Sequence, residues 1–480
     1  MGESGTAASA EADGSEASKK DLPPVVEIDP AGDIILDVTF ETSASTLNKT
    51  RKAELAASRK AGTQPPDRST LKSKVRVGYR VNLAALKKHS KYFSNLLSNS
   101  QFREAKLISD IHEKLAQLKI NAKEADVQDL PWIPITDDDD ATKAAGRENA
   151  MEDLLNIIHQ QPTKTSRGTM PYITTLAIVA DRFDCVAAVA RVLNTDLKFR
   201  WPLTSNKPLR SEDGRATETE QVLRQKILVA WLLGQPMRLQ QATREIIMRG
   251  SSLWSEFHDQ DTTMTAAWWN LPDGLEDADY NAEELRHRRE CILNTVSSVQ
   301  RHFLALFSSR ERQCKLGYDS SAACDSYQLG QMLKFFVNKN LLFLVDYSPA
   351  SLNMVPDTAM IEIEELLSTL QQCPSYQVDK HHTNCGLRTR LEPILIYMRS
   401  MLSANVISIP YADWKKRPTD ISWLAQKEHE ADDRDSAPKK FQFTRAIAND
   451  QRLRYEGALY VDKMAKAMFL ADEWDWTPET

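Results

Sequence analysis

The stretch that decides the fold is Tyr79–Ala105, YRVNLAALKKHSKYFSNLLSNSQFREA. Hydrophobic residues alternate up to its start, at Val75, Val77 and Tyr79 itself, which is typical of a strand. Over residues 83–97 the apolar spacing changes to three and four, which predicts helical segments with one buried face. Upstream, DIILDVTF at residues 33–40 predicts another strand. Two strands and a buried helical hairpin, without a catalytic motif, predict a scaffold for protein contacts.

These segments resemble the BTB/POZ domain family. The matching positions are Asp37 and Val38 in the first strand, Tyr79 and Val81 in the second, Leu86, Ser90, Tyr92 and Phe93 in the helices, and Phe102, Glu104 and Ala105 at the end. Asn82 stands where the family usually has His. The resemblance continues through a strand at Trp132–Ile135 and closing helices at 151–159 and 173–193. It implies a BTB/POZ-like domain over residues 28–200, with an insertion at 43–74.

The rest of the chain divides by composition and periodicity. Residues 1–27 are polar and aperiodic, which predicts a disordered tail. Amphipathic patterns predict a helical domain at 218–345 and a C-terminal helical region at 355–470. The expected fold class is therefore α+β: a small sheet flanked by helices, followed by a mostly helical region. This order resembles a group of fungal BTB-domain proteins.

Composition limits the function classes. The 480 residues carry a net charge of −6, which argues against a dominant nucleic-acid-binding surface. No apolar run approaches the roughly 18 residues that a membrane span needs, and the polar N-terminus predicts no signal peptide. The sequence contains no P-loop, GxGxxG, GxSxG or HExxH motif. We therefore expect a nuclear or cytoplasmic protein without direct nucleic-acid or membrane partners.

The six cysteines are expected to be thiols or metal ligands. Cys314 and Cys324 form a Cys-x9-Cys pair, and His382 and Cys385 form a His-x-x-Cys pair. Two such pairs from separate segments can supply the four soft or borderline donors of a structural zinc site. Ordinary buried thiols without a cofactor are the favoured interpretation, because the first gap is wide. His381 and Cys373 are alternative ligands.

Two further groups have a structural interpretation. The acidic run Asp137–Asp140 is predicted to supply the N-cap and first-turn carboxylates of the following helix. Cys185 lies in an apolar helical pattern, where a buried and inert thiol is expected.

The leading hypothesis is a non-enzymatic protein–protein interaction scaffold. The resemblance implies homodimerisation, for which DIILDVTF and the 83–97 segment are the candidate surfaces. It also implies two specific roles: substrate adaptor of a cullin-type ubiquitin ligase, or transcriptional or chromatin cofactor. An enzyme with its site around Cys314, His382 and Cys385 is the rival hypothesis, but the sequence contains no base–nucleophile pair to support it.

Overall fold

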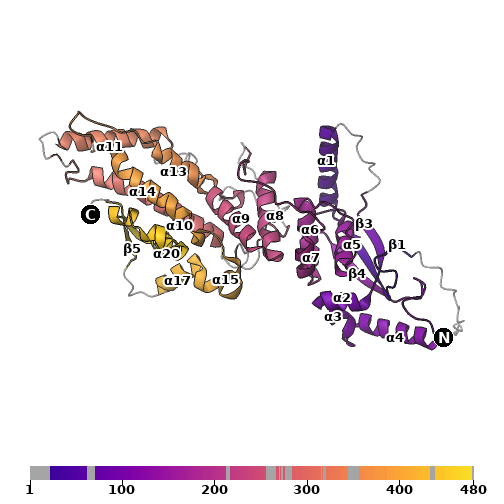
Figure 1. Ribbon diagram of the computed structural model, residues 1–480. Coiled ribbons are helices and arrows are strands. Elements are labelled where there is room, and N and C mark those ends of the chain that lie inside the picture. The colour runs from indigo at the N-terminus through magenta and orange to yellow at the C-terminus, as the bar shows by residue number, and fades with distance from the viewer. Residues whose placement is uncertain are drawn as a thin grey trace, which may run out of the picture. The chain divides into compact units, whose positions relative to one another are not determined.

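The chain forms an α+β structure made of two compact units. The computed structural model describes residues 22–61, 71–211, 217–255, 266–269, 271, 274–275, 284–314, 316, 321–343, 356–383, 385–432 and 438–477. The first unit comprises Met1–Asp139 and Ala144–Pro162, and the second comprises Asp140–Lys143 and Thr163–Thr480 (Figure 1). No helix among the described residues combines the length and apolar content needed to cross a membrane.

The first unit is built on a four-stranded mixed sheet. Its strands are β1 (Val25–Glu27), β2 (Ile34–Glu41), β3 (Lys74–Val81) and β4 (Trp132–Asp138), in the order β1-β3-β2-β4. β2 pairs antiparallel with β3 and parallel with β4, and β1 pairs parallel with β3. Ile34, Ile35 and Leu36 of β2 are wholly buried. Because both faces of this central strand are covered at its start, the strand opens with three consecutive apolar residues.

The predicted helical hairpin is present but interrupted. α2 (Leu83–His89) ends at Ser90, and α3 (Lys91–Ser98) begins directly after it. Ser90 has an extended backbone, and its hydroxyl accepts a hydrogen bond from the Phe93 N–H at 3.0 Å. A serine in this position is an N-cap, so it starts a new helix while keeping the apolar spacing. Leu86 and Phe93 are fully buried, as their spacing predicted.

Three helices complete the first unit. They are α1 (Ala44–Ala61), α4 (Arg103–Gln117) and α5 (Arg147–Ile158). α1 lies in the predicted insertion 43–74, of which residues 62–70 fall outside the described residues. The predicted disordered tail is wrong for residues 25–27, because β1 pairs with β3 there; residues 1–21 lie outside the described residues.

The prediction for the acidic run is also wrong. Asp137 and Asp138 are the last residues of β4, and α5 begins later, at Arg147. Asp137 forms a buried ion pair with Arg147, 2.5 Å between Oδ2 and Nε. Asp139 accepts hydrogen bonds at the start of α1, from Ser43 at 2.7 Å and from Thr46. Burial acts to raise the pKa of Asp139, but the hydrogen bonds from Thr46 and Ser43 outweigh it and lower the pKa.

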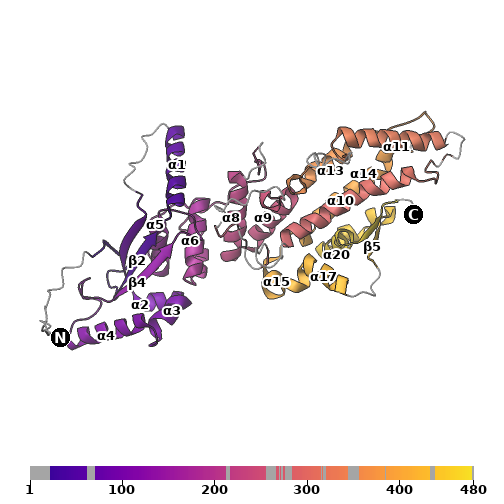
Figure 2. The ribbon, with the colours of Figure 1, turned by 180° about the vertical axis from the view of Figure 1, so that it is seen from behind.

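The second unit is mostly helical. Its longer elements are α6 (Met170–Arg182), α7 (Val186–Val192), α8 (Glu218–Leu232), α9 (Pro236–Arg249), α10 (Glu284–Ser308), α11 (Ser321–Asn338), α13 (Ile363–Gln371), α14 (Leu387–Leu402), α17 (Trp423–Asp432) and α20 (Ala458–Phe469). Short helices α15 (Tyr411–Lys416), α16 (Pro418–Ile421), α18 (Arg445–Ala448) and α19 (Arg452–Tyr455) and a parallel strand pair, β5 (Lys440–Gln442) and β6 (Glu473–Asp475), complete it. α20 packs against both α10 and α14, as both views show (Figures 1 and 2).

One hydrophobic core runs through this unit. It contains buried residues from α8 to the C-terminal segment, including Trp476, which is wholly buried and donates its indole N–H to Ser298 at 2.8 Å. Arg288 of α10 is also buried, ion-paired to Glu284 at 2.6 Å. Its other donors reach the carbonyl oxygens of Val406, Ser408 and Ile421. Arg288 therefore fixes the segments around residues 406–408 and 421 to α10, because each hydrogen bond gives a buried backbone carbonyl its partner.

The units do not follow the predicted domain boundaries. The resemblance assigned residues up to 200 to the first domain, but α6 and α7 belong to the second unit, where α6 packs on α8. The two predicted helical regions, 218–345 and 355–470, contribute to a single core. The segment after residue 470, which lies beyond the predicted C-terminal helical region, is part of the same unit, because β6 pairs with β5. Domain boundaries depend on which helices pack against each other, and hydrophobic periodicity shows only which face of a helix is buried.

Candidate metal centre

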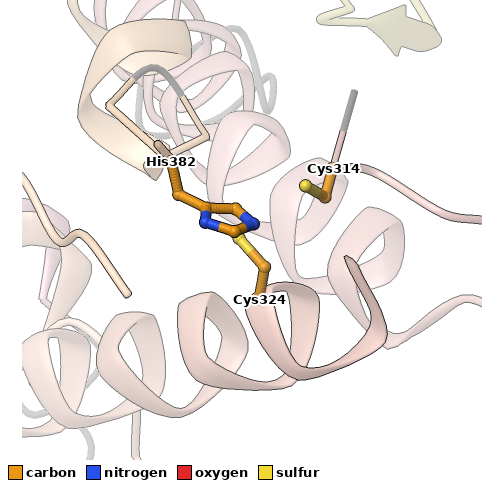
Figure 3. A group of neighbouring side chains, drawn as sticks. All are labelled: Cys314, Cys324 and His382. Atoms are coloured by element: carbon orange, nitrogen blue, oxygen red, sulfur yellow. The ribbon is translucent and has the colours of Figure 1, made fainter. Parts of the chain in front are cut away.

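Three separate segments of the second unit bring the predicted metal ligands together. Cys314 lies in the segment that follows α10, and Cys324 lies in the first turn of α11. His382 and Cys385 lie in the loop between α13 and the start of α14. The ligand atoms of Cys314, Cys324 and His382 all lie within 4.8 Å of one another. Figure 3 shows these three side chains converging on one point.

The fourth predicted ligand, Cys385, lies next to Cys314. Its Sγ lies 3.7 Å from the Sγ of Cys314, and all the cysteines are free thiols. Cys385 is partly buried, whereas Cys314, Cys324 and His382 are 6%, 0% and 1% exposed. Three of the four predicted side chains therefore lie within 4.8 Å of one another, and the fourth, Cys385, lies beside Cys314, although the two pairs are far apart along the chain.

Asp379 fixes the orientation of the histidine, and sequence analysis missed it. Its Oδ1 lies 2.8 Å from His382 Nδ1 and also accepts the backbone N–H of His381 at 2.7 Å. The second bond is an Asx-turn, which shapes the loop that carries the ring. With Nδ1 held by a carboxylate, Nε2 is the ring nitrogen left to face the cysteines, an arrangement common behind metal-ligating histidines. The sequence signal was Asp three residues before His.

The side chains also perturb one another's protonation. Burial and the neighbouring negative charges of Cys385 and Cys314 raise the pKa of Cys324 to about 12. Burial acts in the same direction on Cys314, but hydrogen bonds from the Leu316 backbone and from neighbouring side chains outweigh it and lower its pKa. The hydrogen bond to Asp379 raises the pKa of His382. The geometry, with the ligand atoms of Cys314, Cys324 and His382 within 4.8 Å of one another, places these side chains close enough to bind one metal ion.

The alternative ligands lie apart. His381 is exposed, and the Cys373 thiol lies 3.8 Å from the carbonyl oxygen of Pro374. Neither belongs to the group of potential metal ligands found among the described residues. Cys185 is buried, and burial raises the pKa of its thiol to about 12. That thiol stays protonated at neutral pH and is unsuited to nucleophilic chemistry, as expected.

A groove beside the centre was not predicted. It has a volume of about 1040 Å³ and runs between α14 and the α18–α19 segment. Thr383 of the metal-ligand loop lines it, together with Arg388, Glu392 and Arg445. The hydroxyl of buried Tyr397, another lining residue, has no hydrogen-bond partner among the described residues. Charges of both signs line this open groove, so charge alone selects no class of ligand.

No family model, no curated protein and no solved structure matches this chain. Three thiols and one imidazole are soft and borderline donors, the set that binds zinc-type divalent ions.

Proposed function

We propose that this chain is a non-enzymatic protein–protein interaction scaffold whose first unit is BTB/POZ-like and self-associating. One observation carries the proposal: most of the positions through which the sequence resembles that family lie in the core of the first unit, while Tyr92 and Phe102 lie on its surface. Tyr79, Leu86, Ser90 and Phe93 are each at most 1% exposed. Motif residues that share one buried core are what a shared fold requires.

The chemistry of the first unit also favours binding over catalysis. Among its described residues, no cluster of His, Cys, Asp and Glu lies close enough to hold a metal ion. Its buried charges act structurally, as in the Arg147–Asp137 pair that joins β4 to α5. Large apolar side chains remain on its surface instead, including Tyr92 at 40% and Phe102 at 43% exposure. Exposed aromatic residues of this kind are common anchors in protein interfaces.

Of the two candidate dimer surfaces, we retain only the helical one. DIILDVTF forms the inner strand β2, so its apolar side chains are covered within the unit and cannot meet a second copy. The helical segment α2–α3 and the start of α4 keep exposed apolar positions. We therefore place self-association at Tyr92 and Phe102.

The test compares two variants of the full-length chain. Tyr92→Glu with Phe102→Glu puts charges on the proposed surface, and Asn95→Glu with Gln101→Glu puts the same charges on exposed polar neighbours. Light scattering after size exclusion is expected to show a dimer for the wild type and the control, and a monomer for the first variant. A monomeric wild type, or equal dimerisation of both variants, would overturn the self-association proposal.

Affinity purification with mass spectrometry then defines the role. A cullin that is lost only with the Tyr92/Phe102 variant would make the protein a substrate adaptor of a ubiquitin ligase. Chromatin or transcription factors lost in the same way would make it a nuclear cofactor. Either result fits the nuclear or cytoplasmic location that we propose. Partners unaffected by that variant would move the interaction role away from this surface.

A further inference from the structure

We propose that Cys314, Cys324, His382 and Cys385 bind one zinc ion, which acts as a structural clamp of the second unit. The site lies in a different unit from the proposed interaction surface and rests on separate observations. Either proposal can therefore fail without the other.

The sulfur positions have the spacing of a metal site. In a tetrahedral zinc centre with Zn–S bonds of about 2.3 Å, two coordinating sulfurs lie about 3.8 Å apart. The observed distance between Cys314 Sγ and Cys385 Sγ is 3.7 Å. A disulfide would require about 2.05 Å between the sulfurs. The ligand atoms of Cys324 and His382 lie within 4.8 Å of the Cys314 sulfur, and a disulfide between Cys314 and Cys385 would not account for their position.

The segments that carry the ligands are held in place by other bonds. Gln313, next to Cys314, accepts a hydrogen bond from Arg390 of α14 at 2.8 Å and donates its N–H to Asp325 of α11 at 2.9 Å. Gln328 of α11 donates to the Tyr376 carbonyl of the loop before α14 at 3.0 Å. Hydrogen bonds among the segment after α10, α11 and the α13–α14 region therefore hold the ligand-bearing segments in place without the metal. Such a preformed site lowers the entropy cost of binding an ion.

The donor set and its burial select zinc in a structural role. Three thiolates and one neutral imidazole complete a four-coordinate shell, so no position remains for a water or a substrate. Calcium and magnesium prefer oxygen donors, which this set lacks. When zinc binds, the cysteine thiols release their protons to solvent, and three sulfur–zinc bonds and one nitrogen–zinc bond form. The ion would then join the end of α10, the start of α11 and the start of α14.

The first test measures metal in the full-length chain, purified without chelators or a metal-binding tag. Elemental analysis by mass spectrometry is expected to find about one zinc per chain in the wild type. Cys314→Ala, Cys324→Ala and Cys385→Ala should each lose the zinc. Cys291→Ala and Cys373→Ala are matched controls, because both thiols are buried in the same unit but lie outside the cluster. Zinc retained by Cys324→Ala, or iron in place of zinc, would overturn the proposal.

A second measurement uses only the wild-type protein, so it remains informative if the cysteine variants fail to fold. The reduced wild-type protein is stripped with a chelator, reloaded with zinc or cobalt, and treated with an alkylating reagent under native conditions. Zinc should slow alkylation of Cys314, Cys324 and Cys385 but not of Cys373, and cobalt should give the absorption of a tetrahedral thiolate complex. A wild type that takes up neither metal, or equal alkylation with and without zinc, would refute the site.

Discussion

Phe93→Ala tests the architecture of the first unit most directly. Phe93 is wholly buried, whereas its neighbour Tyr92 is 40% exposed. A buried Phe removes roughly 150–250 Å² from water, which at about 25 cal/mol per Å² is worth about 4–6 kcal/mol as an upper bound. Measured Phe→Ala changes in protein cores cost about 3–5 kcal/mol. We expect that loss for Phe93→Ala and about 1 kcal/mol or less for Tyr92→Ala, as for other surface changes.

The two variants are matched because the rings form an edge-to-face pair, 5.3 Å between centroids, and either change removes that pair. Because Tyr92 also lies on the proposed self-association surface, exchange is measured at a concentration where both variants are monomeric, and the difference then isolates burial. Native-state hydrogen exchange, read by mass spectrometry on peptides from β2 and β3, reports the first unit separately from the second. A loss of 3–5 kcal/mol should speed exchange of the most protected amides by about a hundredfold to a few thousandfold. Equal exchange in both variants would refute the packing of α3 on the sheet.

Three other changes probe single features. Gly250 and Gly274 both have a left-handed backbone, but a Cβ at Gly250 would clash with the carbonyl oxygen of Ala359, whereas a Cβ at Gly274 meets nothing within 4 Å. Denaturant unfolding should show Gly250→Ala to be about 1–3 kcal/mol more destabilising than Gly274→Ala, and equal losses would contradict the packing around Gly250. The pKa of Asp139 is lowered by folding, so its stabilisation is complete above the unfolded value of about 3.9 and is lost as the pH falls through the folded pKa. Asp139→Asn should lower stability at neutral pH and flatten this acid dependence, and an unchanged pH profile would remove the proposed role. Asp379→Asn should weaken zinc binding about 10- to 100-fold in competition with a chelator, because the carboxylate that orients His382 is lost; unchanged affinity would exclude that role.

Part of the structure could be predicted from local sequence patterns. The strand at 33–40, the alternation that leads to Tyr79 and the helical segments within 83–97 follow from patterns with periods near two and 3.6, which report the face that each element buries. The four candidate ligands were identifiable because thiols and imidazoles in short pairs are rare in a chain with six cysteines. Their chemistry belongs to the residue type and needs no knowledge of the fold.

The sequence by itself therefore determined the α+β class, most helix positions and the donor types of the candidate metal centre. Only the tertiary structure decided that the two ligand pairs meet, that Asp137 pairs with Arg147 instead of starting a helix, and that α6 belongs to the second unit. The physical reason is the separation along the chain over which each interaction acts. Periodicity and capping act over a few residues, whereas a buried charge or a metal ligand takes partners wherever the packing of distant faces brings them.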